Sequence, residues 1–301
     1  MEETVVDVND LSRSFGLKRA LDGVSFRATV GHVYGLVGAN GAGKTTLLKH
    51  LLGLLRAATG SVRVFGLDPV RDPVGVLGRV GYLSEERELP EWMRIDEMMR
   101  YTQAFHPTWD ASYARELLET FGLDPSKKVK ELSKGMRAQA GLLVAVAHRP
   151  ELLILDEPSS GLDAVVRRDI LDAIVRTVAD DGRTVIFSSH LLDEVERMSD
   201  HVTMIQHGRV TLSGALDEVR GGYQRSRVRF VQHFEQPPVL AAALAMEGGG
   251  RTWSVLHSGS LEQFHHSVLA LGGEVVESRD ATLEEIFLAR AGRERQPVEA
   301  A

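Results

Sequence analysis

The sequence of 301 residues contains no cysteine, which excludes a disulfide scaffold, a thiolate nucleophile and a cysteine-ligated zinc or iron–sulfur site. It has no run of 18 apolar residues, so we expect no membrane-spanning helix. Its start, MEETVVDVND, is acidic and does not resemble a signal peptide. The 42 acidic and 35 basic side chains give a net charge of −7, which argues against a general nucleic-acid binder. Together these features predict a soluble, acidic protein of a reducing compartment.

Strand and helix patterns divide the chain into two domains. An apolar run at 33–37 stops at a glycine-rich turn before a helical pattern begins, which is the opening of a parallel α/β unit. A mostly helical stretch follows at about 85–150, and strands and helices then alternate up to a predicted hairpin at His207-Gly208. We therefore predict an α/β domain over 1–220, a small α+β domain over 223–290 with a loop at 248–250, and a flexible tail over 291–301.

The segment Gly38–Thr45 fits the phosphate-loop pattern G-x-x-x-x-G-K-[ST]. Its glycines allow successive backbone N–H groups to surround an oxyanion, and the helix that comes next adds a partial positive charge. Lys44 supplies a cation for the β- and γ-phosphates, and the hydroxyl of Thr45 is the expected Mg²⁺ ligand. The segment predicts binding of a nucleoside triphosphate, although kinases, GTPases, helicases and transport ATPases all share it.

Two acidic residues come directly after a second apolar run. The residues Leu152–Leu155 are typical of a buried parallel strand, which places the next residues of the chain at the carboxyl edge of the sheet, where open α/β folds bind ligands. Asp156 can hold Mg²⁺ directly or through water, and Glu157 is placed to orient or deprotonate the attacking water. Together with the phosphate loop, this pair predicts a site for hydrolysis of the triphosphate.

The segment Leu132–Met136 (LSKGM) resembles the LSGGQ signature of ATP-binding cassette (ABC) ATPases. The resemblance runs in register over about 1–220: Ser159–Asp163 resembles the family's D-loop, Gly81–Glu85 its Q-loop, and His190 its switch histidine. Phe15 falls where the family places an aromatic that stacks on adenine.

The sequences of Leu132–Asp163 and Thr282–Leu288 are similar to those of ATPases from bacterial exporters, which have separate membrane subunits and a C-terminal accessory domain. This resemblance implies a phosphate-loop NTPase core with an antiparallel β subdomain and a helical subdomain, which binds ATP and Mg²⁺. It also implies a head-to-tail pair, with a second copy or a paralogous ATPase, that powers an integral membrane permease from the cytoplasmic face of the membrane. The implied catalytic residues are Lys44, Glu157 and His190, the implied metal ligands are Thr45, Glu85 and Asp156, and the implied ATP-binding residues are Phe15, Gly38, Asn40, Gly41, Gly43, Lys44, Thr45, Thr46, Ser133, Gly135 and Asp163.

Several positions depart from the family's pattern. Glu85 stands in place of the usual glutamine, which puts a carboxylate beside Mg²⁺ and the nearby water. Lys134 and Met136 replace Gly and Gln of the signature, and Gly161 stands where Ala is common. None of these departures removes a catalytic group.

The sequence leaves alternatives open for the function and for three segments of the chain. An ABC ATPase that acts on nucleic acid or the ribosome is the alternative function, although such relatives carry long insertions or two fused cassettes and neither is present here. Two interpretations are equally compatible with a group of large apolar side chains: a groove for a membrane partner and the core of a helix. The group is Trp92, Met93, Met98 and Met99. The basic cluster at 127–137 is more typical of a solvated helix entrance than of a lipid-headgroup site. The domain at 223–290 is equally compatible with a dimer brace and a regulatory cap.

Overall fold

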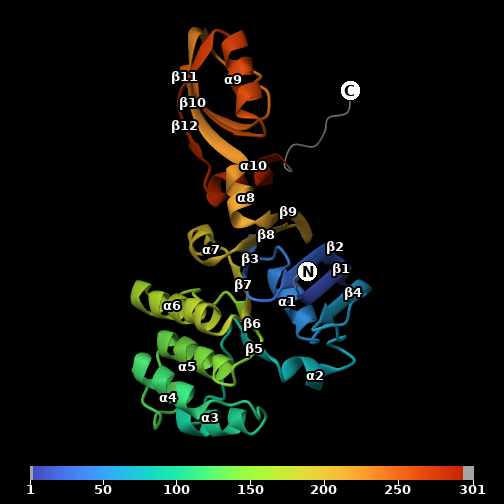
Figure 1. The fold of residues 1–301 in the computed structure, drawn as a ribbon, viewed down its shortest axis with the longest axis vertical. Helices are drawn as coiled ribbons and strands as arrows, with labels where there is room; N and C mark the ends of the chain where they lie inside the picture. Colours follow the sequence, from blue (N-terminus) through green and yellow to red (C-terminus); the bar gives the residue numbers. More distant parts are fainter. Residues whose placement is uncertain (1–2, 294–301) are drawn as a thin grey trace. The chain divides into compact units, whose positions relative to one another are not determined.

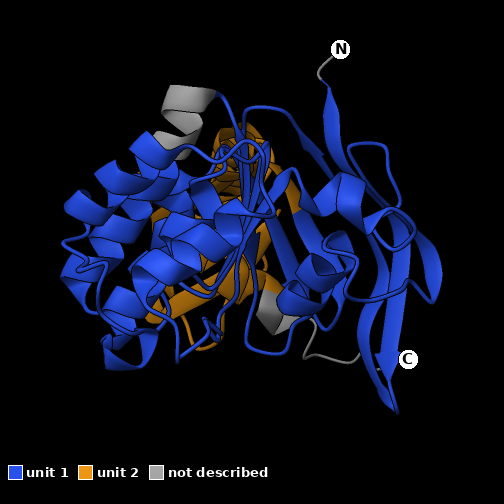
Figure 2. Ribbon diagram, turned by 90° about the horizontal axis from the view of Figure 1, so that it is seen from below, with its two compact units in different colours: residues 1–212 blue, residues 213–301 orange. Residues whose placement is uncertain are grey.

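The computed structural model describes residues 3–293, with side chains described for 3–175 and 182–290. The chain divides into two compact units, residues 1–212 and 213–301 (Figure 2). This division precedes the predicted break at Gly221-Gly222, because helix α8 (Leu216–Gly221) packs on strand β10 (Tyr223–Phe234) within the second unit.

The first unit is built around a six-stranded sheet in the order β5-β6-β7-β3-β8-β9 and a three-stranded antiparallel sheet in the order β2-β1-β4. In the larger sheet, β3 pairs in parallel with β7 and β8, and β6 pairs in parallel with β5 and β7. Every residue of β3, β6 and β7 is buried, as expected for strands covered on both faces. The strands are β1 (Thr4–Phe15), β2 (Lys18–Thr29), β3 (Val33–Val37), β4 (Thr59–Val64), β5 (Val80–Leu83), β6 (Leu152–Asp156), β7 (Thr184–Ser189), β8 (His201–Gln206) and β9 (Arg209–Ala215).

Helices cover this sheet, and the region predicted to be helical holds α3, α4 and α5 (Figure 1). Figure 1 shows these helices and the three-stranded sheet on opposite sides of β5 and β6. The apolar core joins side chains of the three-stranded sheet and α1 to those of the central strands. The helices are α1 (Lys44–Leu51), α2 (Pro73–Leu77), α3 (Ile95–Gln103), α4 (Ala111–Thr120), α5 (Lys134–Val146), α6 (Ala164–Asp181) and α7 (Leu192–Met198), with a 3₁₀ turn at Val129–Glu131.

Two histidines of the helical region stack on each other, His106 after α3 and His148 after α5. The rings of His106 and His148 lie 3.8 Å apart at 27°, and His148 is 2% exposed. Burial, reinforced by His106, lowers the pKa of His148 to about 4. The histidine of an unfolded chain titrates near 6.5, so between these values the unfolded state binds a proton that the folded state does not.

The stability of the folded state should therefore fall as the pH drops below 6.5. For His148 alone, we expect the free energy of unfolding to be about 2 kcal/mol lower at pH 5 than at pH 7.5. Urea unfolding at both pH values checks this, with His148→Gln as the comparison, because glutamine does not titrate. An unchanged difference between the two pH values in His148→Gln would assign the acid sensitivity to other groups.

The second unit is a three-stranded antiparallel sheet in the order β11-β10-β12, with its own core around Phe230, Trp253 and Phe264. Its other elements are α8 (Leu216–Gly221), β10 (Tyr223–Phe234), β11 (Ala243–Ser258), α9 (Leu261–Ala270), β12 (Gly273–Asp280) and α10 (Leu283–Arg293). The predicted loop at 248–250 is wrong, because these glycines lie within β11. Gly248 has φ 134 and Gly250 has φ 65, so the strand bends there and shifts its register without ending. Helix α10 continues to Arg293, and residues 294–301 of the predicted tail lie outside the described residues.

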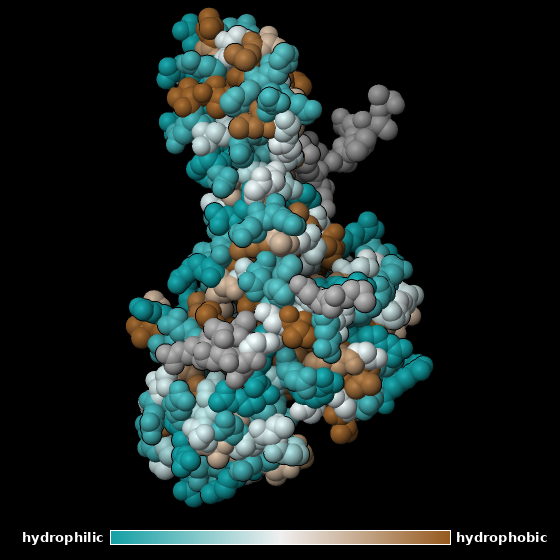
Figure 3. Space-filling view, viewed as in Figure 1, coloured by the Kyte–Doolittle hydropathy of each residue, from teal (hydrophilic) through white to brown (hydrophobic). Residues whose placement is uncertain are grey.

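No helix among residues 3–293 is both long and apolar enough to cross a membrane. The face in Figure 3 is largely hydrophilic, with apolar residues in small separate groups. Of the residues considered for a partner groove, Met93 and Met98 are buried, and Trp92 is 69% exposed. The two methionines therefore belong to the core of the helical region.

Candidate functional site

The phosphate loop connects the central strand β3 to the first turn of α1. Gly43 caps this helix at φ 118, and a Cβ there would lie 2.6 Å from the carbonyl oxygen of Ala20, so only glycine fits. The backbone N–H of Gly208, in the turn between β8 and β9, donates to the carbonyl of Ala42 at 3.0 Å. His207 and Gly208 both have positive φ, which confirms the predicted two-residue hairpin and shows that it supports the loop.

Lys44 points from the loop to the end of β6. Its Nζ donates to the carbonyl oxygen of Gly38 at 2.6 Å and lies 3.0 Å from Oε1 of Glu157, in an ion-pair contact without hydrogen-bond geometry. Both side chains are 5% exposed, so this is a buried pair of opposite charges. The predicted phosphate-binding cation and the predicted base are thus neighbours.

The end of β6 carries the two predicted carboxylates, and β7 holds them in place. Ser188 Oγ donates to Oδ1 of Asp156 at 2.6 Å and accepts the backbone N–H of Glu157 at 2.9 Å. Glu157 has φ 49, in the left-handed region that glutamate rarely adopts. This local conformation turns the chain immediately after the strand, at a cost in backbone strain.

His190 lies directly after β7 and contacts Glu157. Its Nδ1 donates to Oε2 of Glu157 at 2.7 Å, and its backbone N–H reaches the same oxygen at 3.4 Å. A carboxylate can only accept, so Nδ1 carries the proton in this contact. The side chain is 40% exposed, and Nε2 is left for a second contact. Because β7 lies between β6 and β3, the three strands deliver Lys44, Glu157 and His190 to one sheet edge.

A cavity of about 410 Å³ lies along the phosphate loop. Phe15 is 48% exposed at its wall, with the guanidinium carbon of Arg13 5.0 Å from the ring centroid. Of the residues predicted to bind ATP or to act on it, the cavity is lined by Phe15, Asn40, Gly41, Gly43, Lys44, Thr45, Thr46, Glu85 and Glu157.

The three predicted Mg²⁺ ligands, Thr45, Glu85 and Asp156, line a second cavity of about 420 Å³, and two of them also line the first. One hydroxyl and two carboxylates form an oxygen donor set of the kind that Mg²⁺ prefers. Burial, with the negative charges of Asp156, Glu86 and Glu88, raises the pKa of Tyr82 in this cavity to about 12. Four carboxylates line this cavity against the two basic side chains Lys49 and Arg87, a balance that fits a bound cation.

Ser133, Gly135 and Asp163 are not among the residues that line these two cavities. Ser133 caps α5 by accepting the backbone N–H of Met136 at 3.2 Å, and Asp163 accepts the backbone N–H groups of Val165 and Val166 at 3.0 and 3.1 Å. The structure thus places these three residues at the starts of α5 and α6, and Ser133 and Asp163 are exposed.

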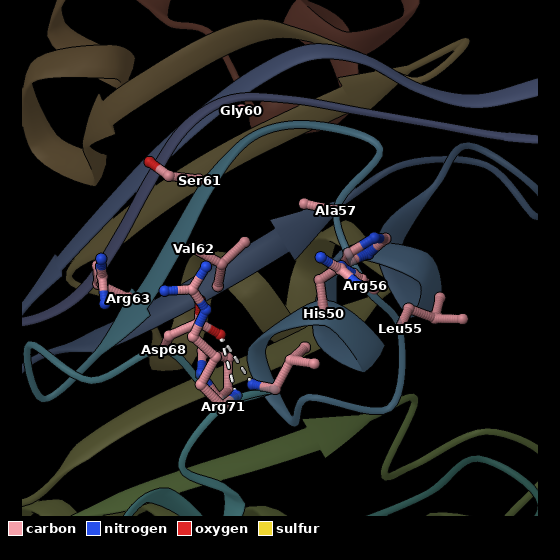
Figure 4. A pocket seen from close by; sticks show the side chains of 12 residues that line it. His50, Leu55, Arg56, Ala57, Gly60, Ser61, Val62, Arg63, Asp68 and Arg71 are labelled. Atoms are coloured by element: carbon pink, nitrogen blue, oxygen red, sulfur yellow. Dashed lines mark hydrogen bonds and ion pairs between the residues drawn. The ribbon is translucent and has the colours of Figure 1, made fainter.

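A further cavity of about 300 Å³ lies at the C-terminal end of α1 (Figure 4). His50, Arg56, Arg63 and Arg71 contribute to its wall, and Asp68 forms an ion pair with Arg71 at 3.6 Å. The sequence had not singled out these residues, and none of the predicted site residues lines this cavity.

The sequence did not predict the polar residues that position Asp156 and the backbone around Glu157. Ser188 links the carboxylate of Asp156 to the backbone N–H of Glu157. The buried Glu194 accepts from Ser159 at 2.7 Å and from Ser189 at 3.2 Å. The signal available was the Ser188-Ser189 pair, which ends an otherwise apolar strand directly before His190. Their partners are far away in sequence and could not be identified.

Comparison with known proteins gives consistent matches. The family profile described as ABC transporter matches residues 21–160. DrrA3, a daunorubicin resistance ATP-binding protein of Streptomyces coeruleorubidus, is 33% identical over 320 residues, which covers 100% of both chains. YtrB, an ABC transporter ATP-binding protein of Bacillus subtilis, is 27% identical and covers 97% of this chain and 100% of its own. A solved ATP-binding subunit of an ABC transporter is 30% identical, with a TM-score of 0.67 over 72% of this chain and 92% of its own.

Proposed function

Because the chain belongs to the ABC transporter family of ATP-binding proteins, we propose that it hydrolyses ATP at the Lys44–Glu157–His190 cluster to power a separate membrane permease. The family establishes the ATPase activity of a transporter subunit. The observation that supports the residue roles is the convergence of a cation, a carboxylate and an imidazole at one sheet edge beside the phosphate loop.

Each residue has a defined part in this proposal. The loop N–H groups and Lys44 bind the phosphates and stabilise the charge that develops on them. Glu157 accepts a proton from the attacking water, and His190 fixes the orientation of that carboxylate through Nδ1. Thr45, Glu85 and Asp156 would hold Mg²⁺, which neutralises charge on the phosphate oxygens when bound. Phe15 offers a ring face for adenine.

The exposed start of α5 supports a paired arrangement. Ser133 and Lys134 are exposed and lie outside the cavity that contains the phosphate loop of their own chain. In a head-to-tail pair, Ser133, Gly135 and Asp163 would instead complete the site of the partner ATPase, and the helix would direct its positive end to the γ-phosphate. The pair would lie on the cytoplasmic face of the membrane against the permease.

Drug export is the form of transport that the relatives favour. DrrA3 is named for daunorubicin resistance and matches the full length of this chain, including residues 213–301. We therefore propose that the permease exports a drug-like molecule. The relatives do not favour the alternative of an ABC ATPase that acts on nucleic acid or the ribosome.

Recovery of the tagged chain from its own cells tests this proposal. We expect it in the membrane fraction together with a hydrophobic protein that spans the membrane several times, and we expect its ATPase rate not to respond to added RNA or DNA. Recovery only with ribosomes, or an ATPase rate that nucleic acid stimulates, would contradict the proposal.

A further inference from the structure

A buried arginine connects a segment that lines the second cavity to the turn that follows Glu157. Arg87 is 6% exposed and has φ 50, and its backbone N–H donates to the carbonyl of Ser84 at 3.1 Å, which closes a turn. The residues of this turn and those up to Leu89 line the cavity that also contains Asp156. The turn therefore presents Glu85 to the site and directs Arg87 into the protein.

The acceptors of Arg87 are backbone carbonyls directly after the proposed base. Its Nη2 donates to the carbonyl oxygens of Pro158 at 3.2 Å and Ser160 at 2.9 Å. Burial lowers the pKa of Arg87, and the nearby charge of Glu85 partly offsets this. Burial of a guanidinium against neutral carbonyl oxygens costs the fold stability, because these acceptors do not compensate the charge as a carboxylate would.

The carbonyls that Arg87 binds belong to a short turn that begins at Glu157. The backbone N–H of Ser160 donates to the carbonyl of Glu157 at 3.1 Å, and Ser159 Oγ donates to the buried Glu194 at 2.7 Å. Both Arg87 and Glu194 thus hold this turn through hydrogen bonds. Such restraint is needed, because Glu157 itself is in a strained conformation.

We propose that Arg87 is a positioning residue that fixes the backbone after Glu157 and so aims its carboxylate at the attacking water. The inference rests on the proposed role of Glu157 as the base.

Kinetics of Arg87→Met and Arg87→Lys test the proposal. We expect Arg87→Met to lower kcat about 10- to 100-fold, because a small misplacement of the base is enough for such a loss, while KM and the affinity for ATP change less than about threefold. Arg87→Lys keeps a cation at the site and should retain an intermediate kcat, so it remains informative if the methionine variant does not fold. Arg183→Met is the matched control, because Arg183 Nη1 also donates to a backbone carbonyl, that of Pro150, before the opposite end of β6.

Two results would overturn the proposal: a kcat of Arg87→Met within about twofold of the parent, or an equal fall in Arg183→Met. The double variant Arg87→Met/Glu157→Gln gives a separate readout. If Arg87 acts through Glu157, the double variant hydrolyses ATP no more slowly than Glu157→Gln alone, whereas independent roles multiply the losses. Should Glu157→Gln itself keep the parent kcat, the role of the base fails; should only Arg87→Met keep it, the positioning role fails.

Discussion

Glu157→Gln is expected to lower kcat about 10²- to 10⁴-fold while ATP binding is retained, because glutamine cannot accept the proton of the attacking water. The variant should accumulate as a stable ATP-bound dimer, since the cycle stops before hydrolysis separates the two copies. Single-turnover measurements of ATP cleavage, together with size-exclusion chromatography in the presence of ATP, check both parts of the expectation.

Glu151→Gln provides the control for this experiment. Glu151 directly precedes β6, whereas Glu157 lies just after it, and the Glu151 carboxylate accepts two hydrogen bonds of 2.6 Å from Arg79. The same chemical change there should leave kcat unaffected. If Glu157→Gln hydrolyses ATP at the rate of the parent, Glu157 is not the base, and another group must activate the attacking water.

Lys44→Ala is expected to weaken ATP binding by at least about 100-fold, because the buried ammonium is the side-chain cation of the phosphate loop. The same change leaves Oε1 of the buried Glu157 without the ammonium of Lys44, although His190 still donates to Oε2, so we also expect the free energy of unfolding to fall by about 3 kcal/mol at neutral pH. Titration with a fluorescent ATP analogue and urea unfolding measure the two effects.

The double variant Lys44→Ala/Glu157→Gln separates the two effects of Lys44→Ala. Neutralising the orphaned carboxylate should restore most of the lost stability without restoring ATP binding. If Lys44→Ala binds the analogue as tightly as the parent does, the loop does not use this lysine for phosphate. A stability loss that the second change leaves intact would mean that the ion pair is not its cause.

The core elements of the site could be predicted because their signals are local. The apolar run of β3 ends directly before the phosphate loop, and that of β6 ends at Asp156 and Glu157. Lys44 and Thr45 are part of one contiguous motif. The start of α5 was also predictable, since Ser133 is a favourable N-cap and its hydroxyl does cap the helix.

The remainder depends on contacts between residues far apart in sequence. Nothing in the sequence pairs Ser188 with Asp156, because the order of β6 and β7 in the sheet is set only when the whole sheet forms. In the sequence Arg87 stands among Glu85, Glu86 and Glu88, which does not predict burial, yet it is 6% exposed and bonds to the segment after Glu157. The prediction of a loop at 248–250 was wrong for a related reason, because antiparallel pairing with β10 keeps a glycine-rich bend within the strand β11.

The left-handed backbone of Glu157 has a consequence for how such a protein changes over generations. The residue combines backbone strain with a buried charge, and each costs the fold stability on the order of 1 kcal/mol or more. A change to glycine would relieve the strain and end turnover, but it would also leave the ammonium of Lys44 buried without its carboxylate partner. The fold itself therefore penalises the loss of Glu157 unless Lys44 changes as well, and we expect substitutions at these two positions to occur together.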